Sequence, residues 1–171
     1  QALENDQYML SLHTELYHVA SYLELEQARF EEKLVVELDV EDDLNCKVPS
    51  FILQPLVENA VRHGGDRTGA RHVSISAHSV EGMAEIAVAD RGQGIPREVV
   101  LGLYTGQGKG VGLSNVHKRL KSIYGEDNGL KIETSEAGSR VWFRIPLEPE
   151  EIPGPIHETK QEESYNEDSC D

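Results

Sequence analysis

The feature that most constrains the fold is a pair of alternating segments in the middle of the chain. Residues 71–80 alternate between apolar and polar side chains, residues 83–89 are a second, mostly apolar strand-like segment, and the link between them ends in Gly82. A period of two is typical of a strand with one buried face, and a short link that contains glycine predicts a β-hairpin. We therefore expect an antiparallel pair of strands as part of the fold.

The rest of the chain alternates between helical and strand-like patterns. We expect helices at 3–32, 51–63, 96–103 and 111–124, and further strands at 34–40, 130–134 and 141–146. Ser50 is placed to cap the second of these helices, and Gly64 with Gly65 to end it. Hairpins interspersed with helices predict an α+β fold, a two-layer sandwich in which helices cover one face of a mixed sheet.

The helix expected at 3–32 has two interpretations. Its apolar residues are spaced mostly by threes and fours from Met9 to Phe30, with an interruption at Glu26. This spacing fits an ordinary amphipathic helix packed on the domain, and it also fits the end of a dimerisation helix.

Length and charge narrow the possible functions. The chain has 171 residues and a formal net charge of -15, which predicts one domain and argues against a nucleic-acid binder. Residues 148–171 hold nine acidic residues and one lysine, and we expect them to be disordered because they can bury too little apolar surface. The chain has no run of about 18 apolar residues, so we expect no membrane span. It starts at Gln1 inside a helical pattern, so we interpret it as a piece of a longer protein.

The helix expected at 51–63 places three polar side chains together. Glu58, Asn59 and Arg62 lie at positions i, i+1 and i+4. An amide oxygen can ligate Mg²⁺ and a guanidinium can bind phosphate oxygens, so this cluster could hold a metal–phosphate group. A solvated helix face with a Glu58–Arg62 ion pair explains the same pattern.

A glycine loop follows the second strand of the hairpin. Asp90 ends this strand, and Gly92 and Gly94 come directly after it. The carboxylate could accept a hydrogen bond from an exocyclic amine, and the glycines would let the backbone approach a flat ligand. A plain strand-to-helix turn would use the same glycines.

A second glycine loop leads into the last helix. Gly106, Gly108, Gly110 and Gly112 alternate with other residues up to the start of that helix, where free backbone N–H groups and the helix dipole can bind phosphate. The spacing matches neither a P-loop nor a Rossmann fingerprint, and a flexible linker is the alternative.

The order and spacing of the three segments resemble the ATP-binding domains of the family that includes histidine kinases, Hsp90, DNA gyrase and MutL. Asn59 with its neighbours resembles the N box, and the two glycine loops resemble the two glycine boxes. Residues 49–64 and 110–120 are more closely similar to sensor histidine kinases of the LytS/YehU type. Residues 12–30 resemble the helix that joins the dimerisation domain to the ATPase domain in that subfamily.

The resemblance covers residues 10–147 and implies the Bergerat ATP-binding fold. It also implies three parts of the chain: a connecting helix at 1–32, a catalytic ATP-binding domain at 33–147 and the acidic tail at 148–171.

The resemblance implies a role for each matched residue. Asn59 would ligate Mg²⁺, and Glu58 beside it would orient or polarise groups through water. Arg62 would contact phosphate, His63 would lie near the sugar and phosphates, and Asp90 would accept from the adenine amino group. The remaining ATP contacts would come from the glycine boxes and the lid: Gly92, Gly94, Ile95, Gly108, Lys109, Gly110, Val111, Gly112 and Leu113.

Several positions depart from the family pattern. Arg91 stands where the first glycine box usually has asparagine. Pro55 stands four residues before Asn59, where some relatives have an acid or amide, which leaves Glu58 as the candidate catalytic carboxylate. The segment between Gly94 and Gly110 is short for an ATP lid, and the chain contains no motif for a phosphoaccepting histidine.

The function implied is that of the catalytic domain of a two-component sensor histidine kinase. It would bind Mg-ATP and transfer the γ-phosphate to a histidine on a dimerisation domain outside this chain, for relay to an aspartate of a response regulator. The resemblance further implies a homodimeric, membrane-anchored bacterial sensor with this part in the cytoplasm. The alternatives are a nucleotide-binding regulatory module without phosphotransfer, another ATPase of the same family, and a purely structural interaction domain.

Overall fold

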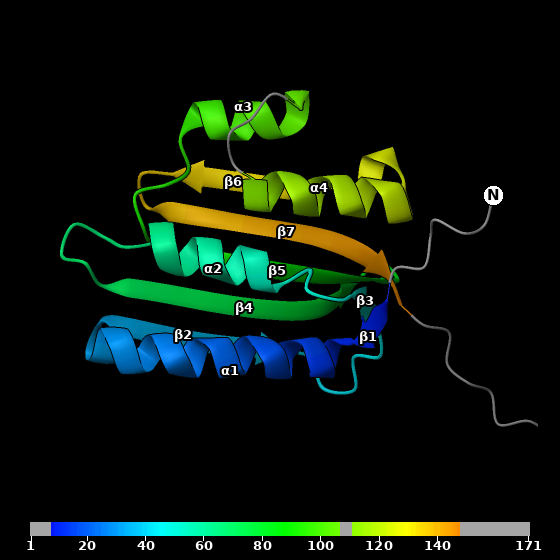
Figure 1. The fold of residues 1–171 in the computed structure, drawn as a ribbon. Coiled ribbons are helices and arrows are strands. Elements are labelled where there is room, and N and C mark those ends of the chain that lie inside the picture. The colour runs from blue at the N-terminus through cyan, green and yellow to red at the C-terminus, as the bar shows by residue number, and fades with distance from the viewer. Residues whose placement is uncertain (1–7, 107–110, 148–171) are drawn as a thin grey trace, which may run out of the picture.

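A five-stranded mixed sheet forms one layer of the fold (Figure 1). The computed structural model describes residues 8–106 and 111–147. The strands are β2 (Leu34–Val40), β4 (Arg71–Val80), β5 (Met83–Asp90), β6 (Lys131–Ser135) and β7 (Gly138–Pro146). They lie in the order β2-β4-β5-β7-β6. β2 is parallel to β4, and the other neighbouring strands are antiparallel.

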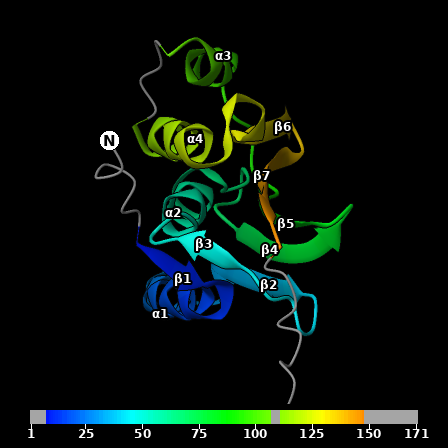
Figure 2. The same cartoon turned by 90° about the vertical axis from the view of Figure 1, so that its right-hand side faces the viewer.

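Helices cover one face of this sheet (Figure 2). They are α1 (Leu12–Phe30), α2 (Gln54–His63), α3 (Arg97–Thr105) and α4 (Val111–Tyr124), with single 3-10 turns at Glu31–Lys33 and Glu126–Asn128. A separate antiparallel pair, β1 (Met9–Ser11) and β3 (Lys47–Pro49), lies beside the start of α1. The predicted two-layer α+β architecture is confirmed.

The core lies between the sheet and the helices because the strands alternate as the sequence predicts. Alternate residues are buried in the middle of β4, as in Val73, Ile75 and Ala77, and along β7, whereas β5 buries Ala84 and the three consecutive residues 86–88. From α1, Leu12, Val19 and Leu23 enter the same core. The described part of α1 thus packs on the domain, as an ordinary amphipathic helix would. No helix among the described residues is both long and apolar enough to cross a membrane.

The structure corrects two helix starts. The expected helix at 3–32 begins only at Leu12, because Met9–Ser11 forms β1 and Ser11 caps the helix by accepting from the Thr14 N–H at 3.2 Å. Residues 1–7 lie outside the described part of the chain. The second helix begins at Gln54 and not at 51, so Ser50 does not cap it. Phe51 has φ +58°, which cannot continue into a helix.

The other predicted elements agree with the structure to within a few residues. The hairpin at 71–90, the strand at 34–40 and the helix at 111–124 all lie where the sequence patterns place them, and Gly64 ends α2. The acidic segment 148–171 lies outside the described residues.

Candidate functional site

A cavity of about 800 Å³ lies between α2, the loop after β5, α3 and the start of α4. Its lining comes from segments that are far apart in the sequence: Pro55, Glu58, Asn59, Arg62, His63, Gln93, Gly94, Ile95, Pro96, Val99, Gly112 and Leu113. All three segments singled out in the sequence contribute to it. The cavity therefore joins the predicted N box and both predicted glycine boxes in one place.

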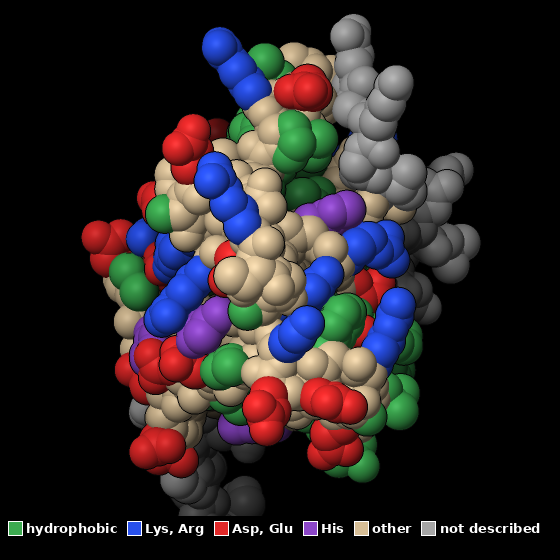
Figure 3. Space-filling model, turned by 90° about the vertical axis from the view of Figure 1, so that its left-hand side faces the viewer, with side chains coloured by type: hydrophobic (Ala, Val, Ile, Leu, Met, Phe, Trp, Pro, Cys, Tyr) green, Lys and Arg blue, Asp and Glu red, His purple; other side chains and the backbone are tan. Residues whose placement is uncertain are grey.

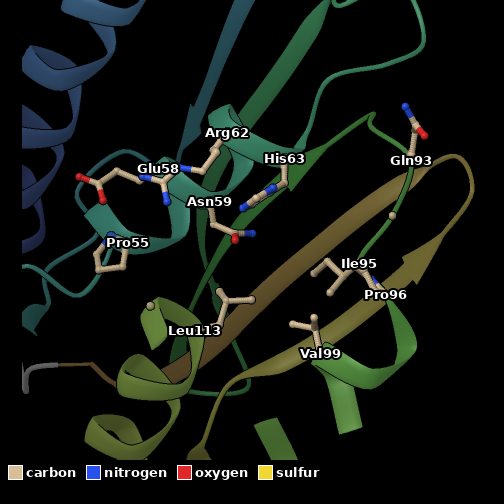
Figure 4. A pocket seen from close by; sticks show the side chains of 12 residues that line it. Pro55, Glu58, Asn59, Arg62, His63, Gln93, Ile95, Pro96, Val99 and Leu113 are labelled. Atoms are coloured by element: carbon tan, nitrogen blue, oxygen red, sulfur yellow. The ribbon is translucent and has the colours of Figure 1, made fainter. Parts of the chain in front are cut away.

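Helix α2 gives the cavity its polar wall. Leu56, Val57, Ala60 and Val61 anchor one side of the helix in the core, so the residues between them face outward. Figure 4 shows the Asn59 and His63 side chains on one side of the space, with Ile95, Val99 and Leu113 across from them. The site thus pairs an amide and an imidazole with an apolar wall.

Glu58 has a different orientation. Its carboxylate points away from Ile95 and Leu113 (Figure 4) and accepts a hydrogen bond from Gln54 Nε2 at 3.1 Å. The ion pairs of the described residues do not include the expected Glu58–Arg62 pair. Glu58 therefore lies at the rim of the cavity, where it could meet a group that arrives from outside.

Asp90 lies at the end of β5 and is half-buried. Its Oδ1 accepts from the Gly92 N–H at 2.9 Å. Burial raises the pKa of its carboxyl group, although backbone N–H groups of Gly92 and Ser139 pull the pKa the other way. Burial disfavours the charged form of a carboxyl group, and a ligand that donates a hydrogen bond to it can offset this cost. Such groups are common in functional sites. Neither Asp90 nor Gly92 is among the lining residues, whereas Gly94 and Ile95 further along the same loop are.

The glycines beside Asp90 are required by close packing. A Cβ on Gly92 would lie 2.7 Å from Cα of Gly64, and a Cβ on Gly64 would lie 2.8 Å from Cβ of Asp90. Gly94 has φ +87°, and its Cβ would meet the Ser135 carbonyl oxygen at 2.4 Å. The sequence analysis explains glycine at 92 and 94 by the access that it gives to a ligand. The structure adds a second explanation, because protein backbone occupies the space that a side chain at either position would need.

The loop after β5 is held in place by β6. The Ile95 N–H donates to Oγ1 of Thr134 at 2.7 Å. The sequence analysis assigned a binding role to Gly94 and Ile95 but not to Gln93, Pro96 or Val99, which also line the cavity. Gln93 lies between two glycines that were predicted to belong to the site, so its position in the sequence could have identified it as a lining residue. Val99 lies in the first turn of α3, and its orientation depends on how that helix packs.

The predicted lid is only partly described. Gly108, Lys109 and Gly110 lie outside the described residues, and so does the side chain of Val111, where α4 begins. Gly112 and Leu113 line the cavity.

Several cationic side chains lie at this end of the molecule. Figure 3 shows Lys and Arg side chains, with His among them, across the middle of the face that includes the end of α2, and Asp and Glu side chains around them. Arg62 in the last turn of α2, Arg91 after β5 and Arg97 at the start of α3 are all exposed. Of these three, Arg62 lines the cavity, where a guanidinium can bind an anionic ligand.

The fold and cavity together are those of a known ATPase class. Residues 49–149 match the model of the histidine kinase-, DNA gyrase B- and HSP90-like ATPase family, and the chain belongs to this family. The predicted Bergerat fold is thus confirmed.

Curated relatives narrow the resemblance to sensor kinases. The chain is 40% identical over 144 residues to the sensor histidine kinase YpdA of Escherichia coli, and 39% identical over 148 residues to the sensor protein LytS of Bacillus cereus. Each match covers 82% of this chain and 25% of the relative. The chain therefore spans about a quarter of the length of these relatives.

Solved structures show the same fold. The nucleotide-free catalytic domain of the histidine kinase ThkA matches with a TM-score of 0.64 at 22% identity, over 82% of this chain and 97% of that one. ThkA in complex with the response regulator protein TrrA also matches with a TM-score of 0.64, at 19% identity, over 84% of this chain and 42% of that one.

The residues present fit ATP and a magnesium ion. The described residues contain no cluster of three or more His, Cys, Asp or Glu that could hold a metal by themselves. Mg²⁺ is usually bound through one or two protein oxygens together with water and phosphate oxygens. The Asn59 amide beside Arg62 and His63 suits that arrangement, and the Asp90 carboxyl group suits a neutral amine donor.

Proposed function

We propose that this chain binds Mg-ATP in the cavity and serves as the catalytic domain of a sensor histidine kinase. In the longer protein it would present the γ-phosphate to a histidine of a dimerisation domain, and a response-regulator aspartate would then receive the phosphoryl group. The observation that carries the proposal is the cavity itself, which brings Asn59, Arg62 and His63 of α2 together with Gly94 after β5 and with Gly112 of α4.

The residues divide the task between the two ends of the nucleotide. Asp90 would accept from the adenine amino group, and Ile95 and Leu113 would contact the flat apolar face of the base. Asn59 would hold Mg²⁺, while Arg62 and His63 would contact phosphate oxygens. The metal would neutralise charge on the transferred group, so that catalysis is mostly positioning.

Two parts of the proposal concern residues that are described incompletely or lie at the rim. Lys109, with Gly108 and Gly110, would close over the phosphates as the lid. Glu58 would orient the incoming acceptor, which its outward direction permits. In this proposal α1 belongs to the connecting helix, and the chain works within a membrane-anchored homodimer.

Calorimetry on the chain and on Asp90→Ala tests the nucleotide site. A lost hydrogen bond to a charged acceptor costs about 1.5–3 kcal/mol, so we expect Mg-ATP affinity to fall about ten- to hundredfold. Asp42→Ala, an exposed change in the turn after β2, is the matched control and should bind like the parent. Failure of the unmodified chain to bind millimolar Mg-ATP would refute the proposal.

Phosphotransfer needs its own experiment. We expect radiolabel from γ-labelled ATP to appear on a separately produced dimerisation domain of a related sensor kinase, and Asn59→Ala to abolish the transfer. Nucleotide binding without transfer would favour the regulatory module considered above.

A further inference from the structure

Glu15 on α1 is a buried carboxylate that the proposed chemistry does not use. Its side chain is 1% exposed. Oε2 accepts from the Phe51 N–H at 3.1 Å, and Oε1 accepts from the Leu53 N–H at 3.2 Å. Leu53 is the N-cap residue of α2, the helix that carries Asn59. A single side chain of α1 therefore fixes the start of the helix that forms the polar wall of the cavity.

Residues 50–53, here called the 50–53 junction, connect three parts of the fold. The Ser50 carbonyl accepts from Arg119 Nη2 of α4 at 2.9 Å, and its N–H donates to the Tyr8 carbonyl at 2.8 Å. α4 begins directly after the predicted lid and contributes Gly112 and Leu113 to the cavity. The junction thus links α1 to α2 and α4, two of the three helices that line the site.

The backbone of the junction needs this support. Phe51 has φ +58°, a conformation that a residue with a large side chain rarely adopts. Its ring is 58% exposed and stacks on His18 of α1, with centroids 6.1 Å apart. Because the exposed ring buries little surface, the hydrogen bond to Glu15 is a principal contact that holds this backbone.

A second contact ties the other ends of the two helices. Arg71 donates from Nε to the Val61 carbonyl in the last turn of α2. Its guanidinium carbon also lies 4.4 Å from the centroid of the Phe30 ring at the end of α1. α1 thus contacts the start of α2 directly through Glu15 and its end indirectly, through Arg71 of β4. A displacement of α1 relative to α2 therefore has to strain or break one of these contacts.

We propose that Glu15 is a positioning residue for the nucleotide site, and that it couples the position of α1 to Mg-nucleotide binding. The inference rests on the proposed function, because Asn59 on α2 is taken as the metal ligand. Coupling between two sites is reciprocal. An orientation of α1 that loosens the 50–53 junction therefore weakens nucleotide binding, and bound nucleotide stabilises the junction.

The test compares Glu15→Gln with the unmodified chain by calorimetry with Mg²⁺ and the non-hydrolysable analogue AMP-PNP. We expect affinity to fall at least about fivefold, the lower end of usual coupling between sites. Glu24→Gln removes the same charge from an exposed position of the same helix and should leave affinity unchanged. In an Asn59→Ala background, Glu15→Gln should have little further effect, because Glu15 acts through the position of Asn59.

Two results would overturn the inference while the proposed function stands. One is binding by Glu15→Gln within about twofold of the parent, which is too small for coupling. The other is an equal loss in the Asn59→Ala background, which shows general destabilisation. If the unmodified chain does not bind AMP-PNP with Mg²⁺, the proposed function is refuted, and the inference is refuted with it because it rests on that function.

Hydrogen exchange provides a readout that needs no variant. AMP-PNP with Mg²⁺ should slow exchange of the Phe51 and Leu53 amides in the unmodified chain, even if Glu15→Gln does not fold. Unchanged exchange at both amides under saturating nucleotide would contradict the coupling.

Discussion

Replacing Gly64 by alanine should destabilise the domain and distort the predicted adenine end of the site. Gly64 has φ -85°, so alanine causes no backbone strain there. The difficulty is space, because the new Cβ would lie 2.2 Å from the Ala60 carbonyl oxygen and 2.8 Å from Cβ of Asp90. Both distances are below van der Waals contact, so the end of α2 must move away from the end of β5.

The size of the effect follows from overpacking. Forcing an extra carbon into a well-packed position typically costs about 1–3 kcal/mol. A cost of about 2 kcal/mol lowers Tm by roughly 4–8 °C in a domain of this size. Gly65→Ala is the matched control, because its Cβ would meet Arg71 only at 3.4 Å. We expect the control to change stability by less than about 0.5 kcal/mol.

Urea unfolding followed by circular dichroism measures the difference between the two variants. Mg-ATP affinity should fall in Gly64→Ala more than in Gly65→Ala, because only the first displaces Asp90. Equal unfolding free energies for both variants would show that the packing of Gly64 against Asp90 is not tight, and would refute the reasoning.

Two further predictions concern acid stability. Burial lowers the pKa of His117, and its Nδ1 accepts from the Leu130 N–H at 2.9 Å, so the folded state holds the neutral ring. The contribution of His117 to the free energy of unfolding should be fully present above pH ~6.5, and it should decrease below that pH as the unfolded state takes up the proton. His117→Asn keeps a hydrogen-bond acceptor that takes up no proton. When unfolding free energy is measured in urea at several pH values, this variant should lack the fall below pH ~6.5 that His117 causes. The same fall in the variant would show that another group is responsible. Glu85 accepts from Arg140 at 2.7 Å and Arg144 at 2.9 Å, which lowers its pKa. Glu85→Gln should cost about 1–2 kcal/mol at pH 7 and progressively less as the pH falls below about 4.5, where the unfolded state takes up the proton first. A cost independent of pH would count against the ion pairs.

Local patterns predicted most of the fold because its long elements have clear periods. The first strand of the hairpin buries alternate residues, and the helix at 111–124 buries one face and ends before Gly125. β1 and β3 were not predicted, because each has only three residues, too few to show the alternation of apolar and polar side chains that indicates a strand. They pair across nearly forty positions in the sequence, and such pairing is decided by tertiary contacts.

Part of the candidate site could be predicted from the sequence as well, and part could not. Asn59, Arg62, His63 and Gly94 could be selected from their match to the family's motifs, and the structure places all four around one cavity. The contact of Gly64 with Gly92 could not be predicted, because it depends on how α2 meets β5. Residue types also could not show that Glu58 turns outward, since either side of a helix accepts a carboxylate.

The parallel pairing of β2 with β4 has a consequence for the order of folding. The β4–β5 hairpin, which ends in Asp90, can form from neighbouring residues. β2 and β4 are separated in sequence by a long connection that contains all of α2, and closing such a loop is entropically slow. We therefore expect the β4–β5 hairpin to form before β2 pairs with β4. In that order a partly folded chain has an incomplete binding site, and we expect nucleotide binding only from molecules that have completed the crossover.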